Sequence, residues 1–577
     1  MRMLLIISSR KRLELPAKLF FLSFYENVRF IFRHSMRKII LVLSKMMKYL
    51  KRFIRRRKSM VEFEIKNKDL LARIGRLKTK SGTVETPAFL PVINMARQSV
   101  TPRELWEEFG CRILITNAYI IKKQQAEEAS RLGIHSFLDF PGVVMTDSGA
   151  YQILAYGDIE VAPEEIIKFQ EEIDTDIATI LDLPTGWGVS KKRAEETVRE
   201  TINRAKKLEA IKSRNDILWV GPIQGGRYLD LVAESAREMS RLPFDIHALG
   251  SPTPVMEQYL FDLLADMIFA AKMNVPFSRP FHLFGAGHPF MFALAVALGC
   301  DLFDSAAYNI FAQDDRYLTT YGTVRLEEIE YLPCSCPVCS KRDPQDLRGM
   351  PKNEREAELT RHNLHVCFAE IRRIKQAIIE GRLWEHLMIR AHGHPSILQA
   401  MKRLKDYGDF IERHSPIVKR SGLFIFSSID LARPEVIRHR KRFRERYTPP
   451  EKMKILILFP SFGPRRTLKS RRYKKILADA CERFHIDKDE VHVCFYVPPF
   501  GVVPIEICDV YPLSQFEIAC PPDEETMKYV AQRIVEYVKK GRYERRVMVV
   551  ESGTWQEEVA RICKEDIKEE LLEFLIV

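Results

Sequence analysis

Two aspartates stand where a short apolar run gives way to small residues. Asp304 ends the apolar pair 302–303, and Asp147 ends the run 143–146 in the same way. This pattern is typical of a buried strand that carries a charged group to its open end. We therefore predict that the two strands direct Asp304 and Asp147 into one pocket, where two carboxylates can act on a single substrate.

Three cysteines form a second cluster with possible chemistry, Cys334, Cys336 and Cys339, spaced as C-x-C-x2-C. The helix predicted over 354–379 carries His362 and His365, which lie one turn apart. Three thiolates and one imidazole make a closed tetrahedral zinc site with no position open for water. We therefore predict one structural Zn²⁺ per chain, held by the cysteines and by His362 or His365, that pins the loop and the helix together.

The elements that must position these residues follow a regular alternation between residues 60 and 412. Strands are predicted at 89–93, 113–117, 143–147, 178–182, 218–224, 245–250, 281–285 and 302–304. Helices are predicted between most of them, for example at 163–172, 191–213 and 229–241. Strands alternating with helices imply right-handed crossovers and a parallel sheet. Eight such units in about 250 residues predict an α/β fold of the (β/α)8 TIM-barrel type, with a zinc-binding insertion at about 330–380.

The predicted strands end in polar or small residues: Asn117, Asp147, Asp182, Gln224, the run 248–250, Gly285 and Asp304. Active sites of such barrels lie at this face, so polar groups gathered there indicate a pocket. Each polar residue could instead cap the following helix, but glutamine is a poor cap and capping does not explain why all the strands end this way. Glycines near these ends would either form turns or let a ligand approach the backbone closely.

Basic residues are concentrated at the start of the chain. Residues 1–59 hold 17 of the 91 Lys and Arg residues but only two of the 77 Asp and Glu residues, so the rest of the chain is nearly neutral. Overall basicity therefore does not indicate that the folded body binds nucleic acid. We interpret residues 1–59 as a disordered extension or a misassigned start, in preference to an arm for RNA or anionic lipid. No apolar run is long enough to span a membrane, and the scattered cysteines indicate a reducing, cytoplasmic compartment.

The pattern changes after residue 412, and residues 413–577 are predicted to form one or two small α/β units. Strands are expected at 422–427, 455–459, 491–497 and 547–550, and helices at 474–484 and 524–540. Two basic runs with interleaved aromatic residues, 438–446 and 465–475, favour phosphate binding by this region. The alternative is a solvated charged face.

Several short motifs give the chain a resemblance to a known family. They are T-D-S-G-A-Y-Q at 146–152, P-I-Q-G-G at 222–226, H-A-L-G-S at 247–251, F-D-S-A-A-Y at 303–308, and the cysteine trio with His362-Asn363. Through them residues 60–403 resemble tRNA-guanine transglycosylases, and the H-A-L-G and D-S-A-A runs are similar to the archaeal, archaeosine-forming type. Weaker similarity continues at 499–504. The resemblance implies the same barrel and zinc site, with His362 as the fourth ligand.

The resemblance also implies an exchange of bases in tRNA. Guanine at position 15 in the D-loop would be replaced by 7-cyano-7-deazaguanine without ATP or a redox cofactor, and the target base must leave its stack to reach the pocket. Asp304 matches the nucleophile that holds the ribose covalently, and Asp147 matches the general acid/base. The reverse assignment of these two roles stays open.

The remaining motif residues would hold the base. Asp182 would accept hydrogen bonds from its N–H groups, and its other edge would lie against Gln224, Gly225, Ala248, Leu249 and Gly250. Tyr151 would stack on the ring, or else is ordinary packing. A non-catalytic tRNA-binding subunit is the alternative function, but both carboxylates are present. A barrel glycoside hydrolase would leave the Q-G-G run and the zinc motif without a purpose.

The archaeal type commonly ends in a PUA domain that grips the acceptor stem, and residues 413–577 contain no recognisable PUA sequence. We therefore expect either that the basic loops of this region dock tRNA or that a separate PUA-containing polypeptide does so. The family further suggests a homodimer formed near the zinc region. The expected partners are thus tRNA, guanine, 7-cyano-7-deazaguanine and a second copy of the chain.

Overall fold

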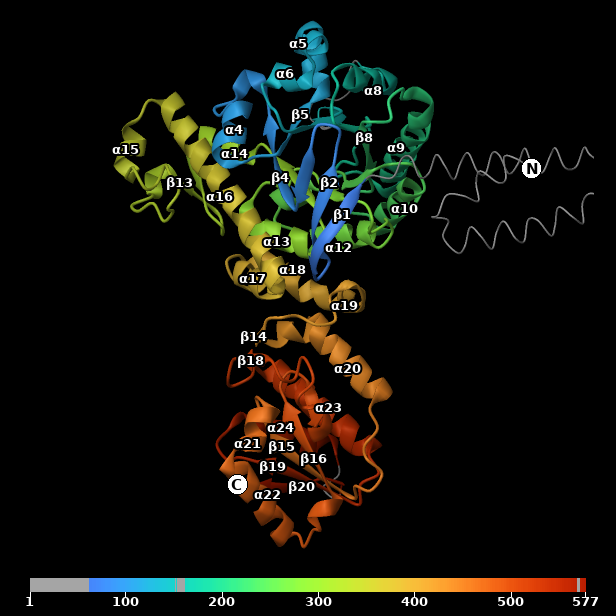
Figure 1. The fold of residues 1–577 in the computed structure, drawn as a ribbon, viewed down its shortest axis with the longest axis vertical. Coiled ribbons are helices and arrows are strands. Elements are labelled where there is room, and N and C mark those ends of the chain that lie inside the picture. The colour runs from blue at the N-terminus through green and yellow to red at the C-terminus, as the bar shows by residue number, and fades with distance from the viewer. Residues whose placement is uncertain (1–61, 151, 153–160, 568–570) are drawn as a thin grey trace, which may run out of the picture. The chain divides into compact units, whose positions relative to one another are not determined.

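A computed structural model describes residues 62–577, except residues 151, 153–160 and 568–570 (Figure 1). The predicted extension at 1–59 lies outside the described residues. Among the helices that the structure describes, none combines the length and the apolar character needed to cross a membrane.

Eight parallel strands close into a barrel, which confirms the predicted fold (Figure 1). Their order around the barrel is β10-β11-β4-β5-β6-β7-β8-β9. The strands are β4 (Ala88–Ile93), β5 (Ile113–Asn117), β6 (Val143–Asp147), β7 (Ile177–Thr179), β8 (Leu218–Ile223), β9 (Ile246–Leu249), β10 (Phe281–Leu283) and β11 (Leu302–Ser305). Strands β7 and β10 end earlier than predicted, so Asp182 and Gly285 lie in the loops that follow them.

Helices connect the strands and cover the outside of the barrel. They are α4 (Pro102–Phe109), α5 (Ala118–Leu132), α6 (Ile134–Leu138), α8 (Pro163–Glu172), α9 (Lys191–Ile211), α10 (Leu229–Ser240), α11 (Thr253–Glu257), α12 (Phe261–Lys272), α13 (Pro289–Ala297) and α14 (Ala307–Gln313). Local signals set several starts: the Thr101 side chain accepts a hydrogen bond from the Glu104 N–H and completes a capping box at α4, and Ser190 caps α9.

Alternation along each strand divides the barrel core into two layers. On β5, Ile113 and Ile115 pack in the barrel interior, whereas Leu114 packs with the surrounding helices. On β11, Leu302 faces the interior and Phe303 faces outward. Because successive side chains of a strand point to opposite faces, the residue after Phe303 must face inward at the end of the strand.

A three-stranded antiparallel sheet precedes the barrel and was not predicted. Strands β1 (Phe63–Asp69), β2 (Ala72–Lys78) and β3 (Thr83–Thr86) pair in this order. Leu77 of β2 and Val84 of β3 pack in the same interior cluster as the first residues of the barrel strands. The sheet therefore covers the N-terminal end of the barrel, opposite the C-terminal strand ends that carry the polar residues.

The segment after β11 holds the predicted zinc-binding insertion. It contains the hairpin β12 (Arg316–Leu318) and β13 (Thr323–Arg325), then α15 (Pro344–Gly349) and the long α16 (Lys352–Glu380). The following helices are α17 (Leu383–Ala391), α18 (Pro395–Arg403) and α19 (Gly408–His414). Short 3-10 helices lie at Met95–Arg97, Leu326–Glu328, Leu404–Tyr407, Ser428–Ala432, Lys488–Glu490 and Ile505–Ile507.

The C-terminal region contains the predicted α/β elements around a five-stranded sheet. Its order is β17-β16-β15-β19-β20, parallel except for β17. The strands are β15 (Ile455–Pro460), β16 (Val491–Val497), β17 (Gly501–Pro504), β19 (Arg545–Val550) and β20 (Glu573–Ile576), and a separate pair joins β14 (Leu423–Ile425) to β18 (Phe516–Ile518). The helices are α20 (Pro434–Arg446), α21 (Pro464–Lys469), α22 (Arg471–Arg483), α23 (Glu524–Lys540) and α24 (Trp555–Asp566).

Candidate active site and metal centre

Asp304 lies at the C-terminal end of β11, with its side chain 13% exposed. Its Oδ1 atom accepts two hydrogen bonds, from His282 Nε2 at 2.7 Å and from the Gly285 backbone N–H at 3.0 Å. The other oxygen, Oδ2, makes no hydrogen bond with another described residue. Two donors on one oxygen fix the orientation of the carboxylate and leave the second oxygen available to a ligand.

His282 is a site residue that sequence reasoning missed. It lies on β10, which pairs with β11, and its side chain is fully buried. Its ring is tilted against Phe284 at 4.6 Å between centroids, and its Nδ1 atom has no hydrogen-bond partner among the described residues. The available signal was a histidine between Phe281 and Leu283, since both neighbours pack outward and the histidine must then face the interior.

Asp147 lies at the end of β6, on the same rim of the barrel as Asp304. Its Oδ2 atom accepts hydrogen bonds from Asn117 Nδ2 at 3.1 Å and from the Gly149 N–H at 3.3 Å. Burial raises the pKa of Asp147 to about 7, and the neighbouring carboxylates of Asp182 and Asp304 contribute to the rise. Asp182 and Asp304 are therefore each close enough to Asp147 for their charges to act on it, and near pH 7 Asp147 can both give and take a proton.

Asp182 and Gln224 form a hydrogen-bonded pair. Both side chains are buried, and Gln224 Nε2 donates to Asp182 Oδ2. The Gln224 oxygen Oε1 accepts from the Thr185 N–H at 3.0 Å and from the Ser251 hydroxyl at 2.9 Å. Burial raises the pKa of Asp182 to about 6 although the hydrogen bond from Gln224 opposes this shift. The Gln224 amide is thus largely engaged by the protein, and its first effect is to orient Asp182.

Gly225 follows Gln224 in the chain, and Gly250 lies against the Gln224 side chain. Both positions need glycine because other atoms approach them closely. A Cβ atom on Gly250 would lie 2.2 Å from Gln224 Nε2. Gly225 has φ 145, and a Cβ atom there would lie 2.5 Å from the Val232 backbone nitrogen. A side chain at either position would displace the Asp182–Gln224 pair or the start of α10.

The other predicted base-binding residues differ in what they can present to a ligand. Ala248 packs in the barrel interior, whereas the Leu249 side chain packs outward against the helices. Leu249 can therefore contact a ligand in the barrel only through its backbone. Tyr151 lies outside the described residues; Gln152 accepts a hydrogen bond at 2.9 Å from Asn117, the residue that also donates to Asp147.

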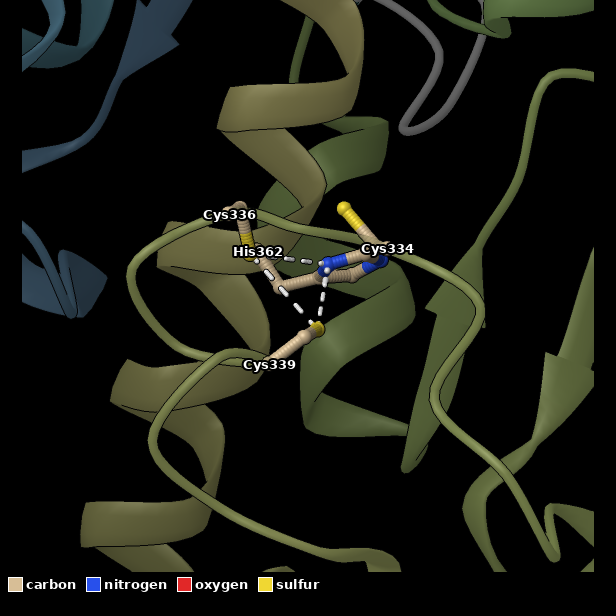
Figure 2. A group of neighbouring side chains, drawn as sticks. All are labelled: Cys334, Cys336, Cys339 and His362. Atoms are coloured by element: carbon tan, nitrogen blue, oxygen red, sulfur yellow. Dashed lines mark hydrogen bonds between the residues drawn. The ribbon is translucent and has the colours of Figure 1, made fainter.

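The predicted metal centre gathers Cys334, Cys336, Cys339 and His362 (Figure 2). Their ligand atoms all lie within 4.8 Å of one another. His362 Nδ1 lies 3.5 Å from Cys336 Sγ and 3.3 Å from Cys339 Sγ. Three thiols and an imidazole at these separations can hold one metal ion.

The surroundings of His362 decide which histidine belongs to this group. Its Nε2 atom hydrogen-bonds to the Leu318 carbonyl at 2.9 Å, which leaves the Nδ1 lone pair directed at the sulfurs. Asn363 accepts from the Leu318 N–H at 2.9 Å and so holds the same strand, β12. His365 instead packs against Phe109, at 4.6 Å between ring centroids. The structure therefore places His362, and not His365, among the three cysteines.

Comparison with known proteins agrees with this arrangement. A family model described as queuine tRNA-ribosyltransferase matches residues 68–396, and one described as a domain of unknown function matches residues 436–574. The chain is 43% identical over 501 residues to tRNA-guanine(15) transglycosylase of Saccharolobus solfataricus, covering 84% of this chain and 96% of that protein. It is 43% identical over 489 residues to the Methanocaldococcus jannaschii protein of the same name, covering 83% and 72%. The chain therefore belongs to the tRNA-guanine transglycosylase family.

Proposed function

We propose that the protein replaces guanine 15 in the D-loop of tRNA with 7-cyano-7-deazaguanine, as a step in archaeosine biosynthesis. The names of its relatives support the reaction and the position. The observation that carries the proposal is the gathering of three carboxylates, Asp147, Asp182 and Asp304, at the open end of the barrel. Removing a base from its ribose needs one group for the sugar carbon and another for the base proton.

Asp304 is the proposed nucleophile. Its Oδ2 atom would attack C1′ of the ribose as the bond from C1′ to the guanine nitrogen breaks, giving an aspartyl-ribose ester. The hydrogen bonds from His282 and Gly285 to Oδ1 would keep the free oxygen directed at the sugar. The incoming base then attacks the same carbon and releases the carboxylate.

Asp147 is the proposed general acid and base. In its protonated form it would give a proton to the leaving guanine, and the carboxylate so formed would take a proton from the incoming base. Its raised pKa suits this use, because an acid with a pKa near the working pH can do both. The opposite assignment would require Asp147 to act as a nucleophile while partly protonated, so the pKa favours the first.

The base would be held between the rim residues. Asp182, oriented by Gln224, would accept from the N–H groups of guanine or of 7-cyano-7-deazaguanine, and the backbone of Gly225 and 248–250 would meet its other edge. Tyr151 would stack on the ring. Both bases present N–H groups on this edge, which explains how one pocket could serve the leaving and the incoming base.

The metal centre is proposed to bind one structural Zn²⁺, because a Cys3His set with no open position is typical of that ion. Zinc there would hold the loop at 334–339 to α16 and would take no part in base exchange. Residues 413–577 are proposed to bind tRNA, alone or with a separate PUA-containing polypeptide. A homodimer and a cytoplasmic location remain proposals that follow from the family.

Asp304→Asn should abolish base exchange. The substitution keeps the shape but removes the nucleophilic oxygen, so exchange should fall by about 10³-fold or more, while tRNA binding changes little. The assay incubates the chain with tRNA, guanine and 7-cyano-7-deazaguanine and maps the exchanged nucleotide. Asp230→Asn, at an exposed residue of α10, is the matched control. Turnover retained in Asp304→Asn would exclude Asp304 as the nucleophile.

Asp147→Asn should change how stability depends on pH. The folded pKa of about 7 lies above the usual value, so the wild type should lose stability as pH rises from about 4 to 7, at up to about 1.4 kcal/mol per unit. The variant, which cannot ionise, should lack this part of the loss. Urea unfolding at pH 5 and pH 7.5 measures the difference.

Asp230→Asn again provides the control, because Lys191 lowers the pKa of Asp230. Its carboxylate is ionised at both pH values, so its effect on stability should be the same at both. An Asp147→Asn variant with the wild-type pH dependence would contradict the raised pKa.

His282 should act by positioning Asp304. His282→Gln keeps an N–H donor near Asp304 Oδ1 and should retain more of the wild-type kcat than His282→Leu, which removes it and should cost about 10–100-fold. The KM for tRNA should stay unchanged in both variants, because His282 is buried and contacts no substrate. Equal kcat in the two variants would mean that His282 only fills space.

Cys336→Ser should lower both the zinc content and the melting temperature. Metal analysis is expected to find one zinc per wild-type chain, and strong chelation should reduce the melting temperature because metal binding is coupled to local folding. Cys520→Ser, at an exposed cysteine outside the cluster, should change neither quantity. A metal-free chain that melts at the wild-type temperature would refute a structural role.

A further inference from the structure

A cavity in the C-terminal region has no part in the chemistry described above. It has a volume of about 250 Å³, more than a purine base occupies. Helix α20 forms one wall, and the segment around 507–513 with Ile417 forms the other. Ile417 and Val510 are 59% and 56% exposed, so apolar surface is left uncovered at its edge.

Aromatic rings line the α20 wall. His439 and Phe443 lie four residues apart on one face of the helix, and Tyr447 follows directly after its last residue. The His439 and Phe443 rings are 5.8 Å apart and nearly parallel at 17°, and the Phe443 and Tyr447 rings are 5.0 Å apart at 17°. The rings stack on one another and give this wall an aromatic, apolar surface against which a planar group such as a base can pack.

Arginines follow the same spacing beside these rings. Arg438 is committed to the fold, because it hydrogen-bonds to the Glu412 carboxylate and to the Pro416 and Ser415 carbonyls. Arg442 and Arg446 also line the cavity, are exposed, and form no ion pair or hydrogen bond with another described residue. Two uncommitted guanidinium groups at the edge of an apolar cavity suit a ligand with a phosphate attached to a planar group.

The acidic residue of the lining does not neutralise these arginines. Glu435 lies 2.9 Å from Lys419 Nζ and 3.4 Å from Arg433 Nε, both of which are buried. These two cations hold the pKa of Glu435 down, at about 2, although burial opposes them. The charge left over at the cavity edge is therefore positive.

Polar contacts behind the rings make the cavity rigid. The Tyr447 hydroxyl lies 3.2 Å from His492 Nε2 and 3.2 Å from a Glu506 oxygen. His492 is buried and contacts the Tyr543 hydroxyl through its other nitrogen. His439 Nε2 is buried and has no hydrogen-bond partner among the described residues.

We propose that this cavity binds one unpaired nucleotide of the tRNA substrate, with its base against the α20 rings and its phosphate on Arg442 and Arg446. An unpaired nucleotide is required because bases within a duplex are stacked and cannot enter a side pocket. The inference rests on the proposed function in taking tRNA as the substrate. It adds a second contact on the RNA, made by a different part of the chain from the barrel.

The test compares two double variants of the full chain. Arg442→Gln/Arg446→Gln should raise the Kd for tRNA about tenfold and reduce the slope of log Kd against log salt by about one or two, because one or two phosphates are then no longer neutralised. Arg131→Gln/Arg199→Gln removes the same charge from exposed residues of the barrel, outside both basic runs, and should have a smaller effect. The kcat at saturating tRNA should be unchanged in both. An equal loss of affinity in the two variants would overturn the proposal.

Photocrosslinking supplies a readout that does not depend on enzyme activity. Wild-type protein irradiated with 4-thiouridine-containing tRNA should give a crosslinked peptide from 439–447 or 507–513, and Phe443→Leu should weaken this crosslink at least severalfold.

The outcomes of the crosslinking and exchange assays separate the two proposals. If the wild-type protein gives the crosslink but exchanges no base, the cavity is supported and the proposed function is refuted. Normal exchange with no crosslink in either peptide would refute the cavity alone. Tight binding of AMP that tRNA does not displace would show a free-nucleotide site instead and would also overturn the proposal.

Discussion

The structure depends on keeping three carboxylates together at one end of an apolar barrel. Asp147 loses hydration on burial and is repelled by the carboxylates of Asp182 and Asp304, and its raised pKa reflects both costs. Each group is stabilised differently: Asp147 by Asn117 and a backbone N–H, Asp182 by Gln224, and Asp304 by His282 and Gly285. These separate partners hold the three carboxylates in different ways and leave different oxygens free. The different roles proposed for the three acids follow from their different hydrogen-bond partners, because the three carboxylate groups are chemically the same.

The opposite end of the barrel carries none of this chemistry and is built for stability. The β1–β3 sheet closes it, and Arg73 of β2 makes two hydrogen bonds, at 2.8 and 2.7 Å, to the buried Asp301 at the start of β11. Breaking such a buried pair from one side costs about 3–5 kcal/mol. Because Asp301 lies three residues before Asp304, this ion pair also fixes the strand that carries the proposed nucleophile. The stability supplied at the closed end thus offsets the cost of holding the buried carboxylates at the open end.

Sequence patterns identified the eight strands because buried parallel strands are short apolar runs between amphipathic helices. They failed where tertiary contacts decide the outcome. The strands of the β1–β3 sheet contain both polar and apolar residues. Their apolar side chains are buried because the sheet covers the end of the barrel, so no local sequence pattern predicts these strands. Sequence also could not show that Thr185 and Ser251, distant along the chain, donate hydrogen bonds to the Gln224 oxygen; contact of Gln224 with the base stays a prediction. His282 was missed although the alternation along its strand places it inward, because a single histidine does not show which group it faces. The metal cluster was predicted because its cysteine spacing is local; the spacing left His362 and His365 open, the resemblance implied His362, and the contact with Leu318 explains that choice.

A pocket that recognises one base and one ribose cannot by itself select a position within a tRNA, because guanines are common. Selection therefore needs contacts with the RNA outside the barrel. The folded chain has almost no net charge beyond residue 59, so general attraction to RNA cannot supply them, and the basic groups must be placed where they act. Arg442 and Arg446 meet this requirement: no other described residue pairs with them, whereas arginines nearby such as Arg433 and Arg438 are committed to the fold. Two contacts joined by one folded chain bind an RNA more tightly than either alone, but only when their spacing matches that RNA. If the proposed nucleotide site binds tRNA, position within the tRNA would be selected by distance rather than by the sequence of bases.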